Sequence, residues 1–320
     1  MKTIGVITTG GDAPGMNAAI RAVTRVAHSN GLQVIGFERG WEGLITGTFR
    51  HLTPRNVGGI IQLGGTILHT ARCPEFKTPE GIQKAAKTLK EHQVCGLIVI
   101  GGDGSFKGAL ELSKICETQM VGIPATIDND VYGTDETIGF DTAVNTAVSE
   151  IDKIRDTAIS HERIFIVEVM GRQRGFLALT IGVTVGAEII IIPENKCNID
   201  EVVTTLNENS RKGKKAGIVV AAEGCGNVSE MAKEVEKKTG SEVRLTILGY
   251  VQRGGSPTAR SRLLASLFAE EAVDLLVQGQ GNRAVGLQNG KVTNIELEES
   301  SSKSKAIDTS LLKLNDMLAI

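Results

Sequence analysis

The sequence predicts an α/β fold of two three-layer αβα domains with mainly parallel sheets, and three observations support this prediction. Short apolar runs rich in β-branched residues alternate with helical patterns from the first residues onward, which is typical of parallel strands buried on both faces. The 320 residues are about twice the usual domain size. The 38 glycines form about 12% of the chain (38/320), against an average of about 7%, so we expect the excess in tight turns.

Eight apolar runs have the length and composition of buried strands. They are Ile4–Thr8, Gln33–Phe37, Leu97–Ile100, Met120–Ile123, Ile164–Val169, Ile189–Ile192, Ile218–Ala221 and Val243–Leu248.

Helical patterns fill the intervals between these strands. Apolar residues recur at helical spacing from Met16 to Ala27, and Gly31 ends the pattern. Further helices are expected over 105–115 and 257–278. Asn289-Gly290 lies between two apolar runs and predicts a hairpin turn.

The end of the chain is predicted to hold a polar linker, Ser300–Ser304, followed by a short helix. Motif-rich turns near Gly139 and Gln252 separate two groups of βα units, so we place residues 1–139 and 252–302 in one domain and residues 140–251 and 303–320 in the other. Each is expected to be Rossmann-like, with ligands bound at the carboxyl ends of the strands.

Composition limits the classes of partner. A formal charge of −2 and a pI near 6.3 give no global basic field for nucleic acid or an anionic membrane. No apolar stretch reaches the roughly 18 residues of a membrane span. The cysteines show no zinc-ligand spacing, the histidines form no metal cluster, and a reduced cytoplasm fits best. The cysteines are Cys73, Cys95, Cys116, Cys197 and Cys225, and the histidines are His28, His51, His69, His92 and His161.

Two segments in the first half have the layout of a phosphoryl-transfer site. The glycine-rich loop Gly101–Gly104 lets backbone N–H groups approach a phosphate, and its Asp103 is expected to hold Mg²⁺. About one βα unit later, Asp128 in the loop Ile127–Asp130 is positioned to take a proton from an attacking hydroxyl. Each segment alone also fits an ordinary turn.

Seven motifs, in order, extend this pattern over nearly the whole chain. They are Gly10-Gly11-Asp12-Ala13-Pro14-Gly15-Met16-Asn17, Ala71-Arg72, Gly101-Gly102-Asp103-Gly104-Ser105, Thr126-Ile127-Asp128-Asn129-Asp130, Lys153-Ile154-Arg155-Asp156-Thr157, Met170-Gly171-Arg172 and Gln252-Arg253-Gly254-Gly255-Ser256-Pro257. Together they resemble the bacterial type of ATP-dependent 6-phosphofructokinase. The resemblance implies transfer of the ATP γ-phosphoryl to the 1-hydroxyl of fructose 6-phosphate in glycolysis, giving fructose 1,6-bisphosphate and ADP, by a homotetramer.

The resemblance also assigns roles to residues. The first domain is expected to bind ATP and the second fructose 6-phosphate. The implied catalytic residues are Asp128 as base, with Thr126, Asp130, Arg72 and Arg172. The implied ATP-binding residues are Gly11, Arg72, Cys73, Gly102, Asp103, Gly104, Ser105 and Gly108, the last leaving room at the start of a helix. If the 128–130 loop is extended, Asp128 and Asp130 project to the same side.

Two further sets complete the implied sites. The substrate set is Thr126, Ile127, Asp128, Met170, Gly171, Arg172, Glu223, Tyr250 and Arg253, with Arg163 and Arg244 reaching in from a neighbouring subunit. The set for an ADP or phosphoenolpyruvate effector, between subunits, is Arg21, Arg25, Arg155, Gly186, Glu188, Lys212 and Lys214.

Several positions depart from the pattern of the family. Tyr250 stands where a His is usual, and Phe176 replaces a common Asp at the head of a helix, which predicts the loss of a helix-dipole contact. Arg174 is also unusual. The effector set is eroded at Gly59, Lys212 and Ala216, which predicts weaker regulation than is usual in the family.

The choice of phosphoryl donor depends on two small residues. Relatives that use pyrophosphate place Asp at the position of Gly104 and Lys at that of Ala125, and both side chains would crowd a nucleotide. This chain is therefore expected to use ATP.

Two other readings stay open at this point. NAD kinases and diacylglycerol kinases also carry a Gly-Gly-Asp-Gly turn, so a kinase with another acceptor is possible, although these families would not predict the Asp128 loop. A catalytically impaired sugar-phosphate sensor is the second alternative. Asp103, Asp128 and Arg72 argue against it.

Overall fold

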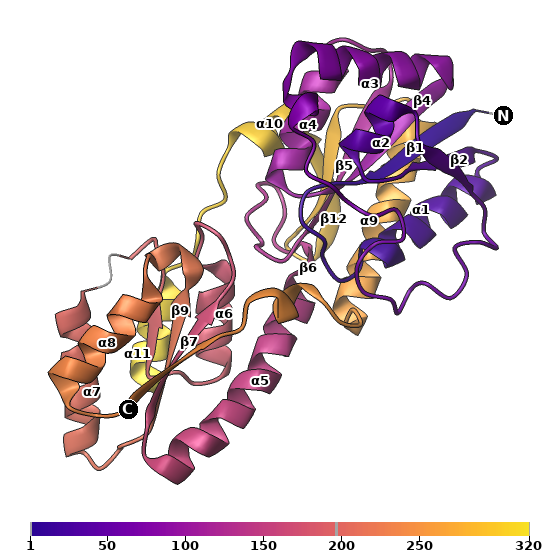
Figure 1. The fold of residues 1–320 in the computed structure, drawn as a ribbon. Helices are drawn as coiled ribbons and strands as arrows, with labels where there is room; N and C mark the ends of the chain where they lie inside the picture. The colour runs from indigo at the N-terminus through magenta and orange to yellow at the C-terminus, as the bar shows by residue number, and fades with distance from the viewer. Residues whose placement is uncertain (1, 196–197, 320) are drawn as a thin grey trace. The chain divides into compact units, whose positions relative to one another are not determined.

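The structure, a computed structural model, describes residues 2–195 and 198–319 and divides into two compact units (Figure 1). Unit 1 consists of Met1–Thr142 and Arg253–Lys305, and unit 2 of Ala143–Gln252 and Ala306–Ile320. The chain therefore changes unit three times. The assignment of ATP to the first domain and of fructose 6-phosphate to the second stays a prediction.

Unit 1 is built on one mainly parallel sheet with the strand order β12-β11-β5-β4-β1-β2-β3. The strands are β1 (Thr3–Thr8), β2 (Gln33–Phe37), β3 (Phe49–Leu52), β4 (Val94–Gly101), β5 (Gln119–Thr126), β11 (Arg283–Gln288) and β12 (Lys291–Glu296), and β6 (Ile138–Gly139) pairs with β5. Only the edge strands β3 and β12 pair antiparallel. This confirms the predicted mainly parallel α/β fold.

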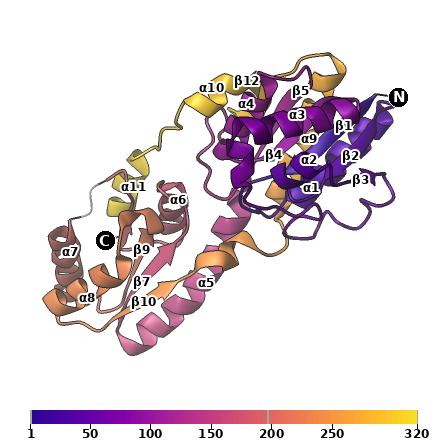
Figure 2. The ribbon, with the colours of Figure 1, turned by 45° about the horizontal axis from the view of Figure 1, so that its top comes forward.

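Helices cover this sheet. α1 (Met16–Ser29) contacts α9 (Ala259–Val277), whereas α3 (Pro79–Glu91) lies beside α4 (Asp103–Ser113), as Figure 2 shows. Side chains of α3 and α4 share a buried apolar cluster with Ile7, Leu97 and Val99 of the sheet. The shorter elements of the unit are α2 (Trp41–Thr46), the 3-10 helix η1 (Pro74–Lys77) and α10 (Leu297–Ser302).

Unit 2 has a smaller, fully parallel sheet of β10 (Val243–Ile247), β7 (Ile164–Val169), β9 (Gly217–Ala222) and β8 (Ile189–Ile191), in that order. Its helical elements are α6 (Phe176–Thr184), α7 (Ile199–Arg211), α8 (Val228–Thr239), α11 (Ser310–Leu318), η2 (Glu223–Cys225) and η3 (Gly249–Arg253), the last ending in unit 1. α5 (Phe140–His161) begins in unit 1 and continues through unit 2.

The predicted hairpin is confirmed, and the predicted linker at Ser300–Ser304 is wrong over residues 300–302, because the non-helical segment before α11 begins only at Lys303. Asn289 and Gly290 have φ of 51° and 76°, as a two-residue hairpin turn between β11 and β12 requires. Ser300 and Ser301 instead lie in α10 and are buried. Their hydroxyls are satisfied there, since that of Ser300 donates to the Tyr132 carbonyl at 2.8 Å and that of Ser301 to the Glu298 carbonyl at 3.1 Å.

Within the described ranges, no helix combines the length and the apolarity needed to cross a membrane. Cys197 lies outside the described residues.

Candidate functional site

Two glycine loops of unit 1 meet at the carboxyl ends of the neighbouring strands β1 and β4. The first glycine loop is Gly10–Gly15, after β1, and the second is Gly101–Gly104, after β4. The Thr9 N–H donates to the Ile100 carbonyl at 3.0 Å, and the Ser105 hydroxyl donates to the Thr9 carbonyl at 3.1 Å. A Cβ at Gly101 would lie 2.5 Å from that Thr9 oxygen, so this close approach requires glycine. A Cβ at Gly104 would meet nothing within 4 Å, which leaves open space beside the loop.

Asp103 is the first residue of α4, where the positive end of the helix dipole favours a phosphate. Its carboxylate lies 2.7 Å from the Lys107 ammonium, in a half-exposed ion pair. The part of the chain that the structure describes holds no group of three or more potential metal-ligating side chains. One carboxylate nevertheless fits Mg²⁺ shared with phosphate oxygens, because Mg²⁺ usually takes one or two carboxylates and keeps several waters.

The Asp128 loop follows β5, the neighbour of β4, and adjoins the second glycine loop. A Cβ at Gly102 would lie 3.5 Å from the Thr126 Cβ. The Thr126 hydroxyl lies 3.3 Å from Asp128 Oδ2 and accepts the Asp128 N–H at 3.2 Å, and Asp128 is only 4% exposed. The structure therefore brings Thr126 and Asp128 to the edge of the sheet where Gly102 and Asp103 lie.

The condition for Asp128 and Asp130 to share one side is not met. Asn129 has a φ of 53°, in the left-handed region, so the loop turns between the two acids instead of extending. Strand-like alternation therefore gives no support for placing these two carboxylates side by side.

Three of the predicted ATP-binding residues, Arg72, Cys73 and Gly108, lie in different surroundings. The Thr8 hydroxyl donates to the His69 carbonyl at 2.8 Å and the Thr70 hydroxyl to the Gly10 carbonyl at 2.8 Å, so the segment before Arg72 is fastened to the first glycine loop. Arg72 is exposed, whereas Cys73 packs against the apolar cluster of the unit.

The expectation that Gly108 leaves room at the start of a helix is wrong. Gly108 is the sixth residue of α4, and a Cβ there would lie 3.0 Å from the Trp41 ring and 3.1 Å from the Phe76 ring. These rings stack with their centroids 4.0 Å apart. Because Gly108 has no side chain, the stacked Trp41 and Phe76 rings can pack closely against α4 at this position.

Arg253, a predicted substrate residue, lies in unit 1 against the first glycine loop. Its guanidinium forms an ion pair with Asp12, and a Cβ at Gly11 would lie 3.0 Å from it. Gly11 thus leaves the space that the arginine fills.

In unit 2, the predicted turn Met170-Gly171-Arg172 follows β7 and is held by two side-chain acceptors, the partly buried Glu223 and the fully buried Gln252. Glu223 Oε1 accepts the N–H groups of Gly171 at 3.1 Å and Arg172 at 2.6 Å, and Gln252 Oε1 accepts that of Met170 at 2.9 Å. Gly171 and Arg172 have φ of 133° and 53°. Glu223, predicted as a substrate ligand, therefore also fixes the backbone of the turn.

The charge of Glu223 reaches a second acid, Glu168 of β7. Burial raises the pKa of Glu168 above its ordinary value, and the nearby negative charge of Glu223 raises it further.

The predicted loss of an acid at the head of α6 is compensated elsewhere in the chain. Glu194 Oε1 accepts the N–H of Gly175, the N-cap of α6, at 3.1 Å, and lies 3.5 Å from Arg174 Nε. The Arg174 guanidinium lies 5.5 Å from the centroid of the Phe176 ring. The helix-dipole contact is therefore present, supplied by Glu194 where the family would use the position of Phe176.

Arg163 and Arg244 lie at the amino-terminal ends of the paired parallel strands β7 and β10, and they share one acid. Arg163 Nε donates to Glu242 Oε2 at 2.6 Å, and Arg244 pairs with Glu242 Oε1. The hydrogen bond from Arg163 holds the pKa of Glu242 below its ordinary value. Tyr250, in η3, is 77% exposed.

Part of the predicted effector set lines one cavity of unit 2, of about 360 Å³. Glu188 is buried at its base, with Oε1 at 2.9 Å from Lys214 Nζ and 3.9 Å from Arg155 Nη1. Arg155 also donates to the Gly186 carbonyl at 3.2 Å. Lys212 is exposed at the end of α7 and does not line the cavity, and Arg21 and Arg25 lie on α1 of unit 1.

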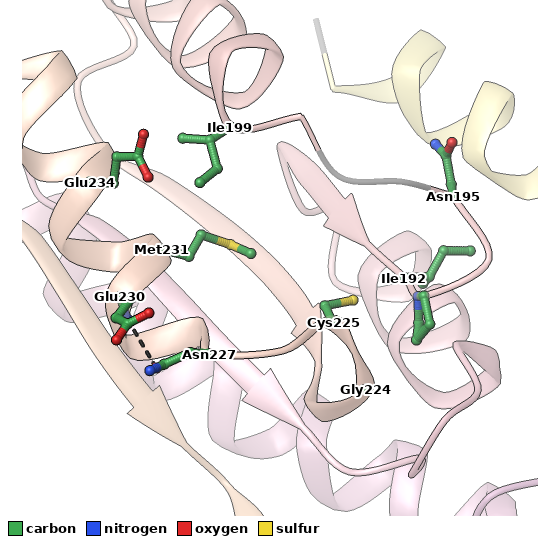
Figure 3. A pocket seen from close by; sticks show the side chains of 10 residues that line it. Ile192, Asn195, Ile199, Gly224, Cys225, Asn227, Glu230, Met231 and Glu234 are labelled. Carbon is green, nitrogen blue, oxygen red and sulfur yellow. Dashed lines mark hydrogen bonds between the residues drawn. The ribbon is translucent and has the colours of Figure 1, made fainter.

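A larger cavity in unit 2, of about 520 Å³, was not predicted from the sequence (Figure 3). Its wall combines the apolar Ile199 and Met231 with Glu230 and Glu234 of α8. Carboxylates on this wall are unfavourable for phosphate, so size alone does not identify the site of the chemistry.

Comparison with known proteins gives consistent matches. A family model described as Phosphofructokinase matches residues 3–276. The ATP-dependent 6-phosphofructokinase of Clostridium botulinum strain Hall is 51% identical over 319 residues, and that of Halalkalibacterium halodurans is 50% identical over 320 residues. Both matches cover 100% of this chain and of the relative.

Solved structures of similar proteins agree on the fold. The phosphofructokinase of Pichia pastoris in the T-state superimposes with a TM-score of 0.90 at 35% identity, over 98% of this chain and 37% of the longer yeast chain. A pyrophosphate-dependent phosphofructokinase from Marinobacter aquaeolei gives a TM-score of 0.87 at 20% identity, over 99% of this chain and 88% of that one. At that identity the likeness shows the fold alone.

Proposed function

Because this chain belongs to the phosphofructokinase family, we propose that it transfers the γ-phosphoryl of ATP to the 1-hydroxyl of fructose 6-phosphate. Full-length relatives at 50% and 51% identity with this activity in their names support the reaction. The observation that supports the residue roles is the parallel pairing of β4 with β5, since Asp103 and Asp128 each follow the carboxyl end of one of these adjoining strands.

The donor phosphates are assigned to the glycine loops and the N-terminus of α4. Asp103 would hold Mg²⁺, which neutralises phosphate charge when it is bound. Backbone groups at Gly104 and Ser105 are proposed to approach the phosphates beside the open space at Gly104, together with those at Gly102 and at Gly11, where the Arg253 guanidinium adds positive charge. Exposed Arg72 supplies positive charge for the transferring group. Cys73 stays a proposed ATP contact at the edge of this region. Gly108 is proposed only to make room for the Trp41 and Phe76 rings that pack against α4.

Asp128 is assigned as the general base. It is nearly buried, it lies within reach of the Thr126 hydroxyl, and a positioned base contributes about 10²- to 10⁴-fold to the rate. Asp130 and Arg172 are assigned supporting roles through their charge.

The acceptor sugar phosphate is assigned to the turn of unit 2 and to arginines. Met170, Gly171 and Arg172 present the turn that Glu223 fixes, and guanidinium groups suit a phosphate dianion because their donors match its oxygens. Thr126, Ile127, Tyr250 and Arg253 complete the proposed contacts. Arg163 and Arg244 are proposed to serve a neighbouring subunit of a homotetramer, in the cytoplasm.

The open space at Gly104 favours ATP over pyrophosphate, since an Asp there would occupy it and add negative charge. Ala125 is a weaker argument, because its methyl group is fully buried and cannot line the donor site.

A coupled assay with fructose 6-phosphate tests the proposal, comparing ATP with pyrophosphate for the natural chain and for Asp128→Ser. We expect faster turnover with ATP, and a loss of about 10²-fold or more in kcat in the variant with ATP affinity kept. A kcat within about threefold of the natural value would remove Asp128 as the base.

The same assay separates the alternatives. Faster turnover with pyrophosphate would contradict the choice of donor. ATP hydrolysis or transfer only to another acceptor would indicate a different kinase, and saturable sugar-phosphate binding without turnover would indicate a sensor.

A further inference from the structure

The loop that carries Asp128 is held by hydrogen bonds of its own side chains, one of which reaches the Asp135 carbonyl. Asn129 Oδ1 accepts the Thr137 N–H at 3.1 Å, and Asn129 Nδ2 donates to the Asp135 carbonyl at 3.1 Å. The Thr137 hydroxyl donates to the Thr126 carbonyl at 2.6 Å. The Asp135 carbonyl is therefore one of the groups that hold Asn129, the neighbour of the proposed base.

A lysine from a distant part of the sequence reaches the same carbonyl. Lys305 Nζ donates to the Asp135 oxygen at 2.8 Å, so Lys305 and Asn129 share one acceptor. Lys305 is half-buried and is the last residue of unit 1, three residues beyond α10. The link joins the end of this unit to the residue next to Asp128.

Acidic groups surround the ammonium of Lys305. Asp130, Asp135 and Glu136 all interact with it through their charge. Glu136 is itself paired with Arg260 of α9, at 2.8 and 2.9 Å, and Asp135 Oδ2 accepts the Asn289 N–H at 2.8 Å. Of the three acids, Asp130 belongs to the proposed active site.

Burial lowers the pKa of Lys305 from 10.5 to about 8, against the opposing effect of Asp135, Asp130 and Glu136. Lys305 is therefore mainly cationic at pH 7 and loses its proton to solvent within the mildly alkaline range.

We propose that Lys305 is a positioning residue for phosphoryl transfer, which holds the Asp128–Asp130 loop through the Asp135 carbonyl and through its charge beside Asp130. This inference rests on the proposed function of Asp128. The cationic form donates the stronger hydrogen bond and attracts Asp130, because charge-assisted hydrogen bonds are about twice as strong as neutral ones. The neutral amine keeps a weaker donor and loses the attraction.

A purely structural anchor would behave differently. If Lys305 only fastened the end of unit 1, its removal would lower stability without changing how kcat depends on pH. The two roles are separated by varying charge and length independently.

The experiment compares kcat between pH 6 and 10 for the natural chain, Lys305→Met, Lys305→Arg and the control Lys87→Met. Lys87 is a good control because it is an exposed lysine of the same unit, on α3, and pairs with Glu91 at 3.6 Å. We expect kcat of the natural chain to fall as pH rises through about 8, following Lys305.

The variants have distinct expected profiles. Lys305→Met should lose about ten- to hundredfold in kcat at pH 7, with the KM for ATP within about twofold, because displacement of a catalytic group by about 1 Å can cost 10²-fold. Lys305→Arg should keep most of kcat at pH 7 and lose the alkaline decline, because arginine stays charged throughout. Lys87→Met should match the natural chain. An unchanged alkaline decline in Lys305→Arg, or a natural kcat in Lys305→Met, overturns the inference.

Hydrogen exchange of peptides covering residues 126–137 tests the same link without turnover. Lys305→Met should speed exchange there at least about tenfold, because the opening of the loop becomes easier, while Lys87→Met leaves it unchanged. Equal exchange in the natural chain and in Lys305→Met overturns the inference even if the proposed reaction is correct. Absence of turnover in the natural chain refutes the reaction alone, since exchange still reports on the loop.

Discussion

At the scale of single residues, Glu223 shows how one side chain can serve both the backbone and a ligand. The sequence indicated it only as a substrate contact, since a carboxylate after a strand carries no sign of its acceptor role. In the structure, one oxygen accepts two N–H groups of the turn. The affinity for the sugar phosphate should therefore depend on Glu223 even where it does not touch the substrate.

Substitution of Glu223 tests this dependence. Glu223→Ala should raise the KM for fructose 6-phosphate about tenfold or more, because hydrogen bonds to a charged group contribute about 1.5 to 3 kcal/mol each. The KM for ATP should stay within about twofold. Glu223→Gln keeps an acceptor oxygen and should fall between the natural chain and Glu223→Ala. If Glu223→Ala leaves both KM values unchanged, the turn does not depend on this side chain.

At the scale of elements, α6 illustrates what a motif comparison cannot see. Phe176 breaks the local rule for the start of a helix, so the sequence predicts a weakened N-terminus. The acid instead comes from Glu194, which lies after β8 and reaches Gly175 through the fold. A compensation between residues about twenty positions apart becomes visible only once the strands are placed.

The contribution of Glu194 is measurable as stability. Glu194→Ala should lower the free energy of unfolding by about 1 kcal/mol, since it removes a capping acceptor and a favourable charge at a helix N-terminus. Chemical denaturation of the full chain measures this value. Glu208→Ala, an exposed position on α7, provides the control and should change stability by less than about 0.5 kcal/mol. Similar losses in the two variants would argue against a capping role.

Most elements could be predicted, and the exceptions have physical reasons. The bounds of β2 and β7 match their predicted runs, because continuous apolar strands of a parallel sheet leave a clear pattern. The edge strand β3, Phe-Arg-His-Leu, has no such run and was missed. Ser300 and Ser301 look like a linker by composition, yet their hydroxyls are satisfied inside the unit.

The candidate site was less predictable than the fold. Motif order indicated Asp103 and Asp128, because strand ends in a parallel sheet converge. Lys305 carries no motif, and its contact with Asp135 depends on how the end of unit 1 returns to the loop. Gly108 was misassigned since spacing does not reveal that Trp41 and Phe76 fill its surroundings.

At the scale of the whole molecule, the sequence predicts that ADP and phosphoenolpyruvate regulate this protein more weakly than is usual in the family. The cavity with Arg155 and Lys214 keeps positive charge, but both cations already interact with buried Glu188. A phosphorylated effector would have to compete with that carboxylate, and lysine binds phosphate without the bidentate geometry of arginine.

Titration of ADP and phosphoenolpyruvate against the fructose 6-phosphate saturation curve tests this prediction. We expect each effector to shift half-saturation by less than about tenfold, or about 1.4 kcal/mol of coupling. Lys214→Met should remove any remaining shift, whereas Lys87→Met, an exposed change on α3, should preserve it. A larger shift in the natural chain would contradict the predicted erosion.

The chain passes from one unit to the other three times, and this affects how it folds while it is being synthesised. Unit 1 needs residues up to Lys305, and unit 2 needs Asn315, whose amide donates to the Ala187 carbonyl at 3.0 Å in a buried position. A nascent chain emerging from the ribosome therefore keeps the sheet of unit 1 incomplete until β11 and β12 are made, and unit 2 lacks α11 until after that. During translation, protection by chaperones matters more for this topology than for two domains encoded one after the other.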